Sequence, residues 1–251
     1  MTPASETTNT SIDRLFLIEQ HRLLKIGLCP DLPGMGFWNS EKKIFEGFEA
    51  ELARRLTRQL LGDEALAEYR PVKPGERLPQ VVNGELDMVL SQLTITPERL
   101  DIVDFSDPYC VAYEALLVLG SSADQTLQDL RGKSVAVAED TASFHRYSKL
   151  HPEIKLVVTT NESDGIFLLL AGKVDGVAND NVNLDGLLAA LPNLDAIKMR
   201  QIDVASSFEP KPFGICIKKG SPIFLAKLNL AISALKEDGT IAGLFEASRD
   251  F

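Results

Sequence analysis

The stretch Leu93-Thr-Ile-Thr-Pro-Glu-Arg-Leu-Asp-Ile-Val-Asp-Phe-Ser-Asp-Pro-Tyr109 follows an apolar run at residues 86–90, and Ser91 stands at the junction. The apolar run predicts a buried strand, so the polar residues after it lie on the loop beyond the carboxyl end of that strand. Two of them, Thr94 and Arg99, combine a hydroxyl with a guanidinium, whose rigid fork of donors binds a carboxylate bidentately. The stretch therefore predicts a carboxylate-binding loop after a buried strand.

Strand and helix patterns alternate in the residues before this stretch. Apolar residues alternate with others over Leu24–Leu28, which predicts a strand, and apolar residues at helical spacing from Phe45 to Leu60 predict an amphipathic helix. Pro79 marks the start of a shorter helix before the buried strand at 86–90. This alternation of strands and helices indicates an α/β domain with a largely parallel sheet.

A second series of strands and helices follows residue 113. After Pro210 and Pro212 the chain returns with one more strand, at 213–217, and an amphipathic helix, which cannot bury themselves alone and must pack on the first series. Two crossings between the series predict two lobes on a two-stranded hinge, with a cleft at the carboxyl ends of the strands. The second series comprises strands at 115–119, 135–137, 156–159, 174–178 and 197–202 and helices at 143–149, 163–171 and 183–191.

These patterns divide the chain as follows. Residues 1–22 are expected to form a leader or tether that ends in a short helix. Lobe 1 is predicted over 23–113 and 208–251, and lobe 2 over 114–207. A short internal repeat precedes a strand in each series: Gly84-Glu-Leu-Asp87 and Gly172-Lys-Val-Asp175. Asp87 and Asp175 are expected to be structural.

The charge and hydrophobic content of the chain exclude several classes of function. The 251 residues include 36 acidic and 26 basic side chains, a formal net charge of −10, and a surface this acidic repels nucleic acid. Hydrophobic residues make up 45% of the chain, enough for a core, yet no apolar run reaches the ~20 residues of a membrane span. The first residues lack the basic and apolar regions of a signal peptide, so none is expected in the sequence as given.

Metal and cofactor chemistry find no support in the sequence. The three cysteines, Cys29, Cys110 and Cys216, lie far apart, without a CxxC motif or a cysteine–histidine cluster. Buried free thiols are the expected state, and a Cys110–Cys216 disulfide is the alternative. Among the histidines, only His145 is expected near the cleft. We expect neither a metal nor a cofactor.

The opening stretch resembles the signature of the type 2 periplasmic solute-binding proteins that supply polar amino acids to ABC importers. That signature reads Thr-Ile-Thr-x-x-Arg followed by Val-Asp-Phe-Ser-x-Pro-Tyr. The resemblance extends over about residues 23–245 and includes Gly47-Phe48-Glu49, Arg77-Leu-Pro79 and Gly172-Lys-Val-Asp175. It implies a periplasmic-binding-protein type 2 fold, in which each lobe is a mixed, mostly parallel sheet flanked by helices and the ligand lies in the interlobe cleft.

The resemblance implies which residues bind the carboxylate and which bind the ammonium of a zwitterionic ligand. Thr94 and Arg99 match the family residues that bind the ligand carboxylate, whereas the sequence alone also allows Arg99 to pair with Asp101 or Asp104 on the surface. Asp180, at the end of a lobe 2 strand, matches the residue that accepts a hydrogen bond from the ligand ammonium. Its alternative role is to cap the helix that follows.

The remaining predicted ligand contacts come from both lobes. Arg77 matches an arginine that reaches the ligand side chain, which favours an acidic ligand. The helix start at residues 141–143 offers free backbone N–H groups to a carboxylate, although Asp140 and Ala142 replace the glycines usual in the family. Gln92 likewise stands where many members have glycine. The other predicted contacts are Ser91, Thr141, Ser143 and the rings of Phe37 and Trp38.

The resemblance implies a non-enzymatic solute-binding protein outside the cytoplasm, periplasmic or tethered to the membrane. We expect a monomer that captures a polar, acidic amino acid (aspartate or glutamate, with glutamine as the alternative) for an ABC importer. Two other functions stay open. Prephenate or arogenate dehydratases share this scaffold and need an acid such as Glu114, Glu139, Asp140 or Asp180, and the same module also serves as the ligand-sensing domain of receptors.

Overall fold

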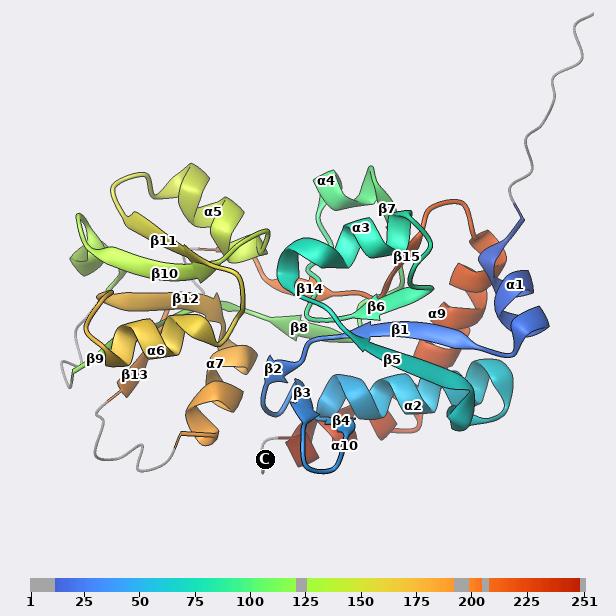
Figure 1. Ribbon diagram of the computed structural model, residues 1–251. Helices are drawn as coiled ribbons and strands as arrows, with labels where there is room; N and C mark the ends of the chain where they lie inside the picture. The colour runs from blue at the N-terminus through green and yellow to red at the C-terminus, as the bar shows by residue number, and fades with distance from the viewer. Residues whose placement is uncertain (1–11, 121–125, 192–198, 205–207, 249–251) are drawn as a thin grey trace, which may run out of the picture.

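Two five-stranded sheets lie side by side and give the molecule two lobes (Figure 1). The computed structural model describes residues 12–120, 126–191, 199–204 and 208–248. The expected leader at 1–11 and the first two residues of the strand predicted at 197–202 lie outside the described residues. No described helix is both long enough and apolar enough to cross a membrane.

Lobe 1 contains the sheet β5-β1-β6-β15-β7. β1 pairs in parallel with β5 and β6, whereas β15 runs antiparallel to both β6 and β7. Only β5, β1 and β6 are therefore joined by parallel pairing. β15, which follows the return of the chain from the other lobe, runs in the opposite direction. The strands are β1 (Leu24–Leu28), β5 (Ala67–Pro71), β6 (Met88–Leu90), β7 (Val103–Phe105) and β15 (Cys216–Lys218).

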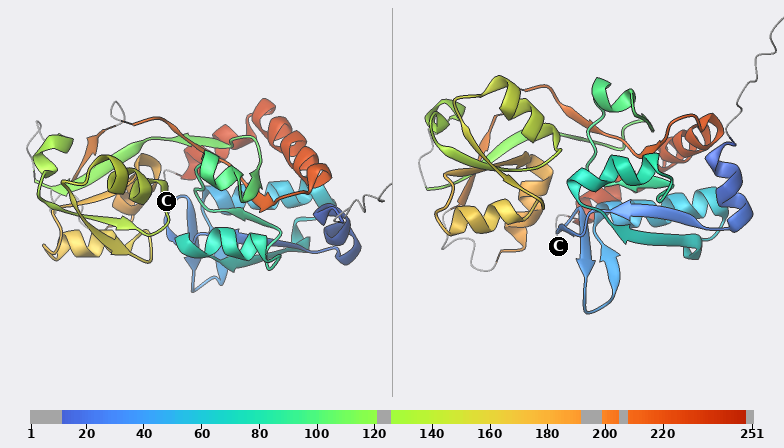
Figure 2. Two further views of the ribbon diagram at one scale, coloured as in Figure 1. Left: turned by 90° about the horizontal axis from the view of Figure 1, so that it is seen from above. Right: turned by 45° about the horizontal axis from the view of Figure 1, so that its top comes forward.

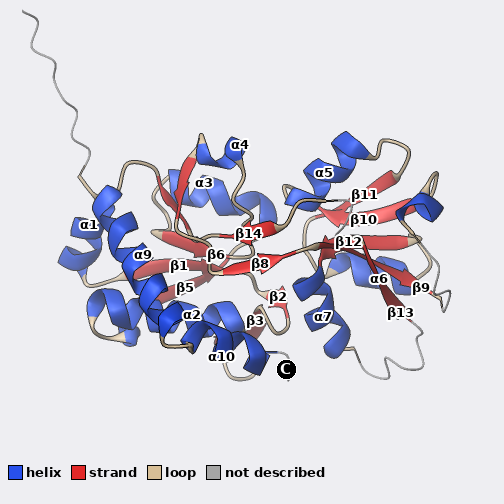
Figure 3. Cartoon of the chain, turned by 180° about the vertical axis from the view of Figure 1, so that it is seen from behind, coloured by secondary structure: helices blue, strands red, loops and turns tan. Residues whose placement is uncertain are grey.

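Helices cover both faces of this sheet. Neighbouring residues of a strand point to opposite faces, so each face has apolar side chains that a helix can bury. Met88 and Leu90 of β6 belong to the core cluster that includes residues of α2 and α9, whereas Val89 packs with Val81 of α3. Figure 3 shows α1, α2, α9 and α10 along the rear of lobe 1. The helices are α1 (Arg14–His21), α2 (Phe48–Leu61), α3 (Arg77–Val82), α4 (Pro97–Leu100), α9 (Pro222–Glu237) and α10 (Thr240–Ala247), with short 3-10 turns at Glu64–Leu66 and Pro74–Glu76.

Lobe 2 repeats this arrangement with the sheet β11-β10-β12-β9-β13. Val135 and Val137 pack with Tyr147 of α5 on one face, whereas Ala136 belongs to the cluster with Ile166 of α6. The elements are β9 (Glu114–Leu119), β10 (Ser134–Ala138), β11 (Lys155–Thr159), β12 (Gly176–Asp180), β13 (Met199–Asp203), α5 (Ala142–Leu150), α6 (Asp164–Leu170), α7 (Asn181–Ala189) and a 3-10 turn at Leu127–Leu130.

Two antiparallel strands run between the lobes: β8 (Cys110–Ala112) and β14 (Lys211–Phe213). The single strand predicted at 213–217 is wrong, because the chain forms β14 and β15 on either side of Gly214. A Cβ atom at Gly214 would lie 2.8 Å from a side-chain carbon of Ile95, so the backbone approaches lobe 1 closely at this break. The exact lobe boundaries remain a prediction.

A small three-stranded sheet between β1 and α2 was not predicted. It comprises β2 (Asp31–Leu32), β3 (Gly36–Asn39) and β4 (Ile44–Glu46), and its hairpin projects from lobe 1 (Figure 2). These strands are too short and too mixed in polarity to give a recognisable alternation.

The two aspartates of the internal repeat form equivalent hydrogen bonds in the two lobes. Asp87 accepts a hydrogen bond from the backbone N–H of Lys25 at the start of β1, and Asp175 accepts one from the N–H of Ser134 at the start of β10. Both carboxylates thus bind the backbone within the first two residues of a neighbouring strand. The structural role predicted for them is confirmed.

Candidate functional site

The two lobes are in direct contact across the predicted cleft. The guanidinium of Arg77 in α3 lies 2.9 Å from a carboxylate oxygen of Glu162 in lobe 2. Arg99 Nη2 donates to the backbone carbonyl of Asp140, also in lobe 2, at 2.7 Å. These contacts bring together four segments that are far apart in the sequence: two short helices of lobe 1 and two loops of lobe 2.

Arg99 is buried at the lobe 1 side of the cleft. Its Nη1 donates to the Thr94 carbonyl at 2.9 Å, so the two predicted carboxylate contacts are adjacent. Burial, reinforced by the nearby Arg77, lowers the pKa of Arg99 to about 10. Of the two alternative partners, neither Asp101 nor Asp104 forms an ion pair with Arg99 in the part of the chain that the structure describes.

Asp180 belongs to a buried ion cluster instead of capping a helix. It occupies the N-cap position of α7 but forms no side-chain capping bond. Its Oδ1 lies 2.7 Å from Lys211 Nζ, which is also 2.5 Å from Glu114 and 2.8 Å from the Ser143 hydroxyl. Burial opposes the charge of Lys211, yet Asp180 and Glu114 outweigh it and raise the pKa of Lys211. The cluster of two carboxylates and one ammonium has a formal charge of −1.

Arg77 is brought to the cleft but already has an anionic partner. Both members of the Arg77–Glu162 ion pair are almost fully buried, with side-chain exposures of 2% and 4%. Glu162 also accepts a hydrogen bond from Asn179 Nδ2 at 2.9 Å. Burial raises the pKa of Glu162, and Arg77 counteracts part of that rise.

Two loop residues of the site have left-handed backbones. Gln92 in lobe 1 has φ 47° and Asp140 in lobe 2 has φ 54°. They are two of the three positions where the resemblance leads one to expect glycine, the third being Ala142, which has no left-handed backbone. The chain therefore keeps a glycine-type backbone with residues that strain it.

The start of α5 in lobe 2 has two roles: Thr141 caps the helix, and Ser143 belongs to the ion cluster around Lys211. Thr141 caps α5, because its hydroxyl accepts a hydrogen bond from Phe144 N and donates to the Ala138 carbonyl. Ala142 and Arg99 line a cavity of about 620 Å³ between α4 and α5, together with His145. This cavity reaches the predicted carboxylate end of the site.

Phe37 and Trp38, the two predicted aromatic contacts, lie on strand β3 of the small hairpin sheet. Trp38 is 40% exposed and packs edge-on against Phe45 within the hairpin. Phe37 lies on the same strand, paired with Asp31 and Glu46. Their predicted stacking on a ligand stays a prediction.

Several buried polar atoms in the cleft region have no hydrogen-bond partner among the described residues. They are Arg77 Nε, Ser91 Oγ, Gln92 Oε1 and Glu114 Oε1. Because a buried polar atom without a partner is costly, such atoms normally meet a ligand or water. Three of the four belong to residues that the sequence predicted as ligand contacts.

Sequence reasoning missed four charged residues of this region. Lys211 had a signal, since it is a lone base between two prolines on the returning hinge strand. Glu49 was noted only as part of a motif. Glu162 and Asp31 gave no signal, although Asp31 accepts hydrogen bonds from both the backbone N–H and the hydroxyl of Ser163 across the lobes.

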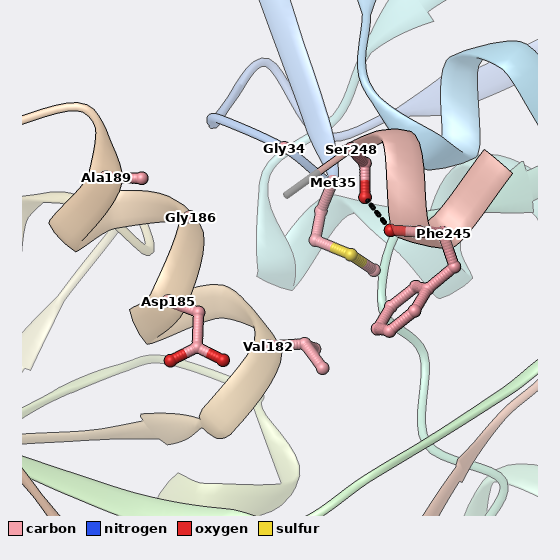
Figure 4. Close-up of a pocket in the computed structure, with 8 residues that line it drawn as sticks. All are labelled: Gly34, Met35, Val182, Asp185, Gly186, Ala189, Phe245 and Ser248. Atoms are coloured by element: carbon pink, nitrogen blue, oxygen red, sulfur yellow. Dashed lines mark hydrogen bonds between the residues drawn. The ribbon is translucent and has the colours of Figure 1, made fainter. Parts of the chain in front are cut away.

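A second interlobe cavity, of about 260 Å³, lies between α7 and lobe 1 (Figure 4). Next to it, α7 approaches the backbone of lobe 1 so closely that a Cβ atom at Gly186 would lie 1.9 Å from the Pro33 carbonyl oxygen. Only glycine permits this approach. The cavity is lined by Gly34, Met35, Val182, Asp185, Gly186, Ala189, Phe245 and Ser248.

The cysteines and the metal-ligating residue types form no further site in the described parts of the chain. Cys29, Cys110 and Cys216 are free thiols, so the alternative disulfide is not formed. The described residues contain no group of three or more histidine, cysteine, aspartate or glutamate side chains that could hold a metal ion.

Comparisons with known proteins cover almost the whole chain. Residues 24–247 match the bacterial extracellular solute-binding proteins, family 3. A glutamine-binding protein of Geobacillus stearothermophilus is 33% identical over 212 residues, 84% of this chain and 78% of that protein. The ABC transporter glutamine-binding protein GlnH of Bacillus subtilis is 29% identical over 228 residues, 90% of this chain and 81% of that protein.

The fold is likewise similar to solved structures. An ancestral amino acid-binding protein, described as a precursor of cyclohexadienyl dehydratase, has a TM-score of 0.81 and 27% identity, and the match covers 94% of this chain and 98% of that chain. The likeness spans both lobes.

Proposed function

This chain belongs to the bacterial extracellular solute-binding proteins of family 3, and from that membership we propose that it captures a polar amino acid, with glutamine as the favoured ligand, for an ABC importer. The observation that carries the proposal is the set of buried, unpartnered polar atoms on Arg77, Ser91, Gln92 and Glu114. A polar ligand between the lobes would satisfy them.

The two ends of an amino acid fit groups on opposite lobes. The ligand carboxylate binds Arg99 and Thr94 of lobe 1, together with the start of α5 in lobe 2. The ligand ammonium binds the negatively charged cluster of Asp180, Glu114 and Lys211, where Glu114 Oε1 has no partner among the described residues. Opposite charges at the two ends suit a zwitterion.

The side chain of the ligand is best uncharged. The expectation of aspartate or glutamate depended on a free cation at Arg77, but Arg77 is neutralised by the buried Glu162. An added carboxylate here would meet an anion already in place, whereas an amide both donates and accepts. The glutamine-binding relatives support the same choice.

Ligand binding is proposed to stabilise the closed arrangement of the lobes. The contacts of Arg99 with Asp140 and of Arg77 with Glu162 exist only when the lobes meet. A ligand that bridges them binds the closed form better and shifts the population toward it. The membrane subunits of an importer are the partner that recognises this form. An extracytoplasmic location, a monomeric state and a membrane tether belong to this proposal.

A thermal-shift screen over the twenty amino acids tests the function, followed by calorimetry with glutamine, glutamate, aspartate and arginine. A ligand that binds only the folded protein raises its melting temperature. We expect glutamine to give the largest rise, with micromolar affinity. No shift with any amino acid would contradict the proposal, and turnover of prephenate or arogenate would replace it with the dehydratase alternative.

A further inference from the structure

Glu49 is a buried acid that the proposed ligand contacts do not use. It is the second residue of α2 and has 0% exposed surface. Its carboxylate accepts a hydrogen bond from the backbone N–H of Gln92 at 2.8 Å and others from Gln92 Nε2 and the Tyr109 hydroxyl. The position in the first turn of a helix also favours a carboxylate, because the positive end of the helix dipole lies there.

Two of these three bonds come from one strained residue of the proposed site, Gln92. Gln92 has φ 47°, a left-handed backbone that a residue with a side chain adopts reluctantly. It lies between Ser91 and Thr94, both predicted ligand contacts on the loop after β6. Glu49 binds the main chain and the side chain of Gln92 at once, so it fixes both the turn of the loop and the direction of the amide.

We propose that Glu49 is a positioning residue, which rests on the proposed function: its buried carboxylate fixes Gln92 and thereby the lobe 1 loop that binds the ligand. Glu49 itself does not touch the ligand. Gln92 Oε1 is buried and has no partner among the described residues, so the side chain that Glu49 orients has one polar atom left for the ligand.

The protonation state of Glu49 then controls the loop. Burial raises the pKa of Glu49 to about 7, although the hydrogen bonds from Tyr109 and Gln92 and the charge of Arg77 oppose the rise. Tyr109 and Cys110 also face it, and burial raises the pKa of the Tyr109 hydroxyl well above its usual range and that of the Cys110 thiol to about 12. Near neutral pH, Glu49 is therefore the group among these acids that changes charge.

Protonation changes what Glu49 offers to Gln92. The carboxylate accepts all three donors, and such charge-assisted bonds are stronger than neutral ones. A protonated carboxyl has an O–H donor of its own, so the Gln92 amide must turn to present Oε1 to it. We expect ligand affinity to fall by about tenfold between pH 8.5 and pH 5.5, a loss of roughly 1.4 kcal/mol.

The test compares wild type with Glu49→Gln and with Glu51→Gln, a control on the same helix whose carboxylate pairs with Arg54 near the surface. Calorimetry with glutamine from pH 5.5 to 8.5 follows the affinity. We expect Glu49→Gln to bind weakly at every pH in this range, and Glu51→Gln to behave as wild type. A wild-type pH profile in Glu49→Gln would overturn the proposal.

A ligand-free measurement separates this proposal from the proposed function. The backbone amide signal of Gln92 in a ¹H–¹⁵N NMR spectrum should move with a midpoint near pH 7 in wild type and stay fixed in Glu49→Gln. Tyr109→Phe removes one donor to the carboxylate and should shift this midpoint to higher pH, which provides a milder variant. If no amino acid binds, the proposed function is wrong, but the Gln92 amide signal still tests the role of Glu49. If the Gln92 signal does not change with pH, the positioning role is wrong, even if glutamine binds.

Discussion

Arg77 of lobe 1 and Glu162 of lobe 2 form an ion pair, 2.9 Å long, between two side chains that are almost completely buried. The pair connects α3 with the segment that precedes α6. Because a buried charge that loses its partner is strongly destabilising, each of these two charges depends on the other in this structure. This relationship sets the charge that a ligand side chain meets in the cleft.

Replacing Glu162 with glutamine should change ligand preference. Glu162→Gln leaves Arg77 buried without an anion, so affinity for glutamine falls, whereas the side-chain carboxylate of glutamate can take the vacated role. We expect the ratio of glutamate to glutamine affinity to rise at least about tenfold. Calorimetry with both amino acids measures this ratio. Glu68→Gln, which removes an exposed ion pair with Arg70, is the control, and an unchanged ratio in Glu162→Gln would argue against a cleft role for Arg77.

Removing the guanidinium of Arg99 should abolish micromolar binding. The ligand carboxylate would then be buried without its cation, a loss on the order of 3–5 kcal/mol, or more than a hundredfold in Kd. Calorimetry of Arg99→Ala measures the loss. Arg55→Ala removes an exposed arginine of α2 and should bind as wild type. Wild-type affinity in Arg99→Ala would show that the carboxylate binds elsewhere.

Gly186 should control closure without touching the ligand. Glycine to alanine normally stabilises a helix by about 1 kcal/mol, but a Cβ atom at Gly186 would clash with the Pro33 carbonyl oxygen. We expect Gly186→Ala to keep or raise the melting temperature while it weakens ligand binding and prevents the compaction that ligand causes in small-angle X-ray scattering. In α10, Gly243 has open space around it, so Gly243→Ala should close normally. Normal compaction of Gly186→Ala would contradict this prediction.

The left-handed backbone at Asp140 predicts opposite effects of two substitutions. Asp140→Gly relieves the strain at φ 54° and keeps the carbonyl that accepts from Arg99, so stability should rise by up to about 1 kcal/mol with unchanged affinity. Asp140→Val, β-branched, should lose at least about 1 kcal/mol. Urea unfolding measures both. Equal stability of the two variants would mean that the strain at this position is negligible.

The raised pKa of Glu49 predicts a pH-dependent stability. An acid whose pKa is about 7 in the folded state and near 4.5 when unfolded binds a proton more tightly in the folded state. Its contribution is therefore present at low pH and is lost as pH rises from about 5 to about 8, by as much as about 3 kcal/mol. Urea unfolding at both pH values should show wild type losing stability relative to Glu49→Gln over this range. Parallel pH dependence of the two proteins would refute the shift.

Local sequence patterns were sufficient for most of the scaffold. β1 was predicted with the bounds that the structure has, because its apolar residues alternate and its end is marked by prolines and glycines. Asp87 and Asp175 were expected to be structural, and each binds the backbone at a strand start. The hairpin of β2, β3 and β4 was missed, since strands of two to four residues carry too little pattern.

The sequence by itself determined the two-lobed α/β chain and the loops that face the cleft, because strands, helices and binding motifs are short-range patterns. Only the tertiary structure decided which charges pair. Arg77 meets Glu162 across 85 positions of sequence, and Ser143 meets Lys211 across 68. Such pairs depend on how the lobes and hinge strands are placed in space, and that placement results from packing of the whole chain rather than from any local segment.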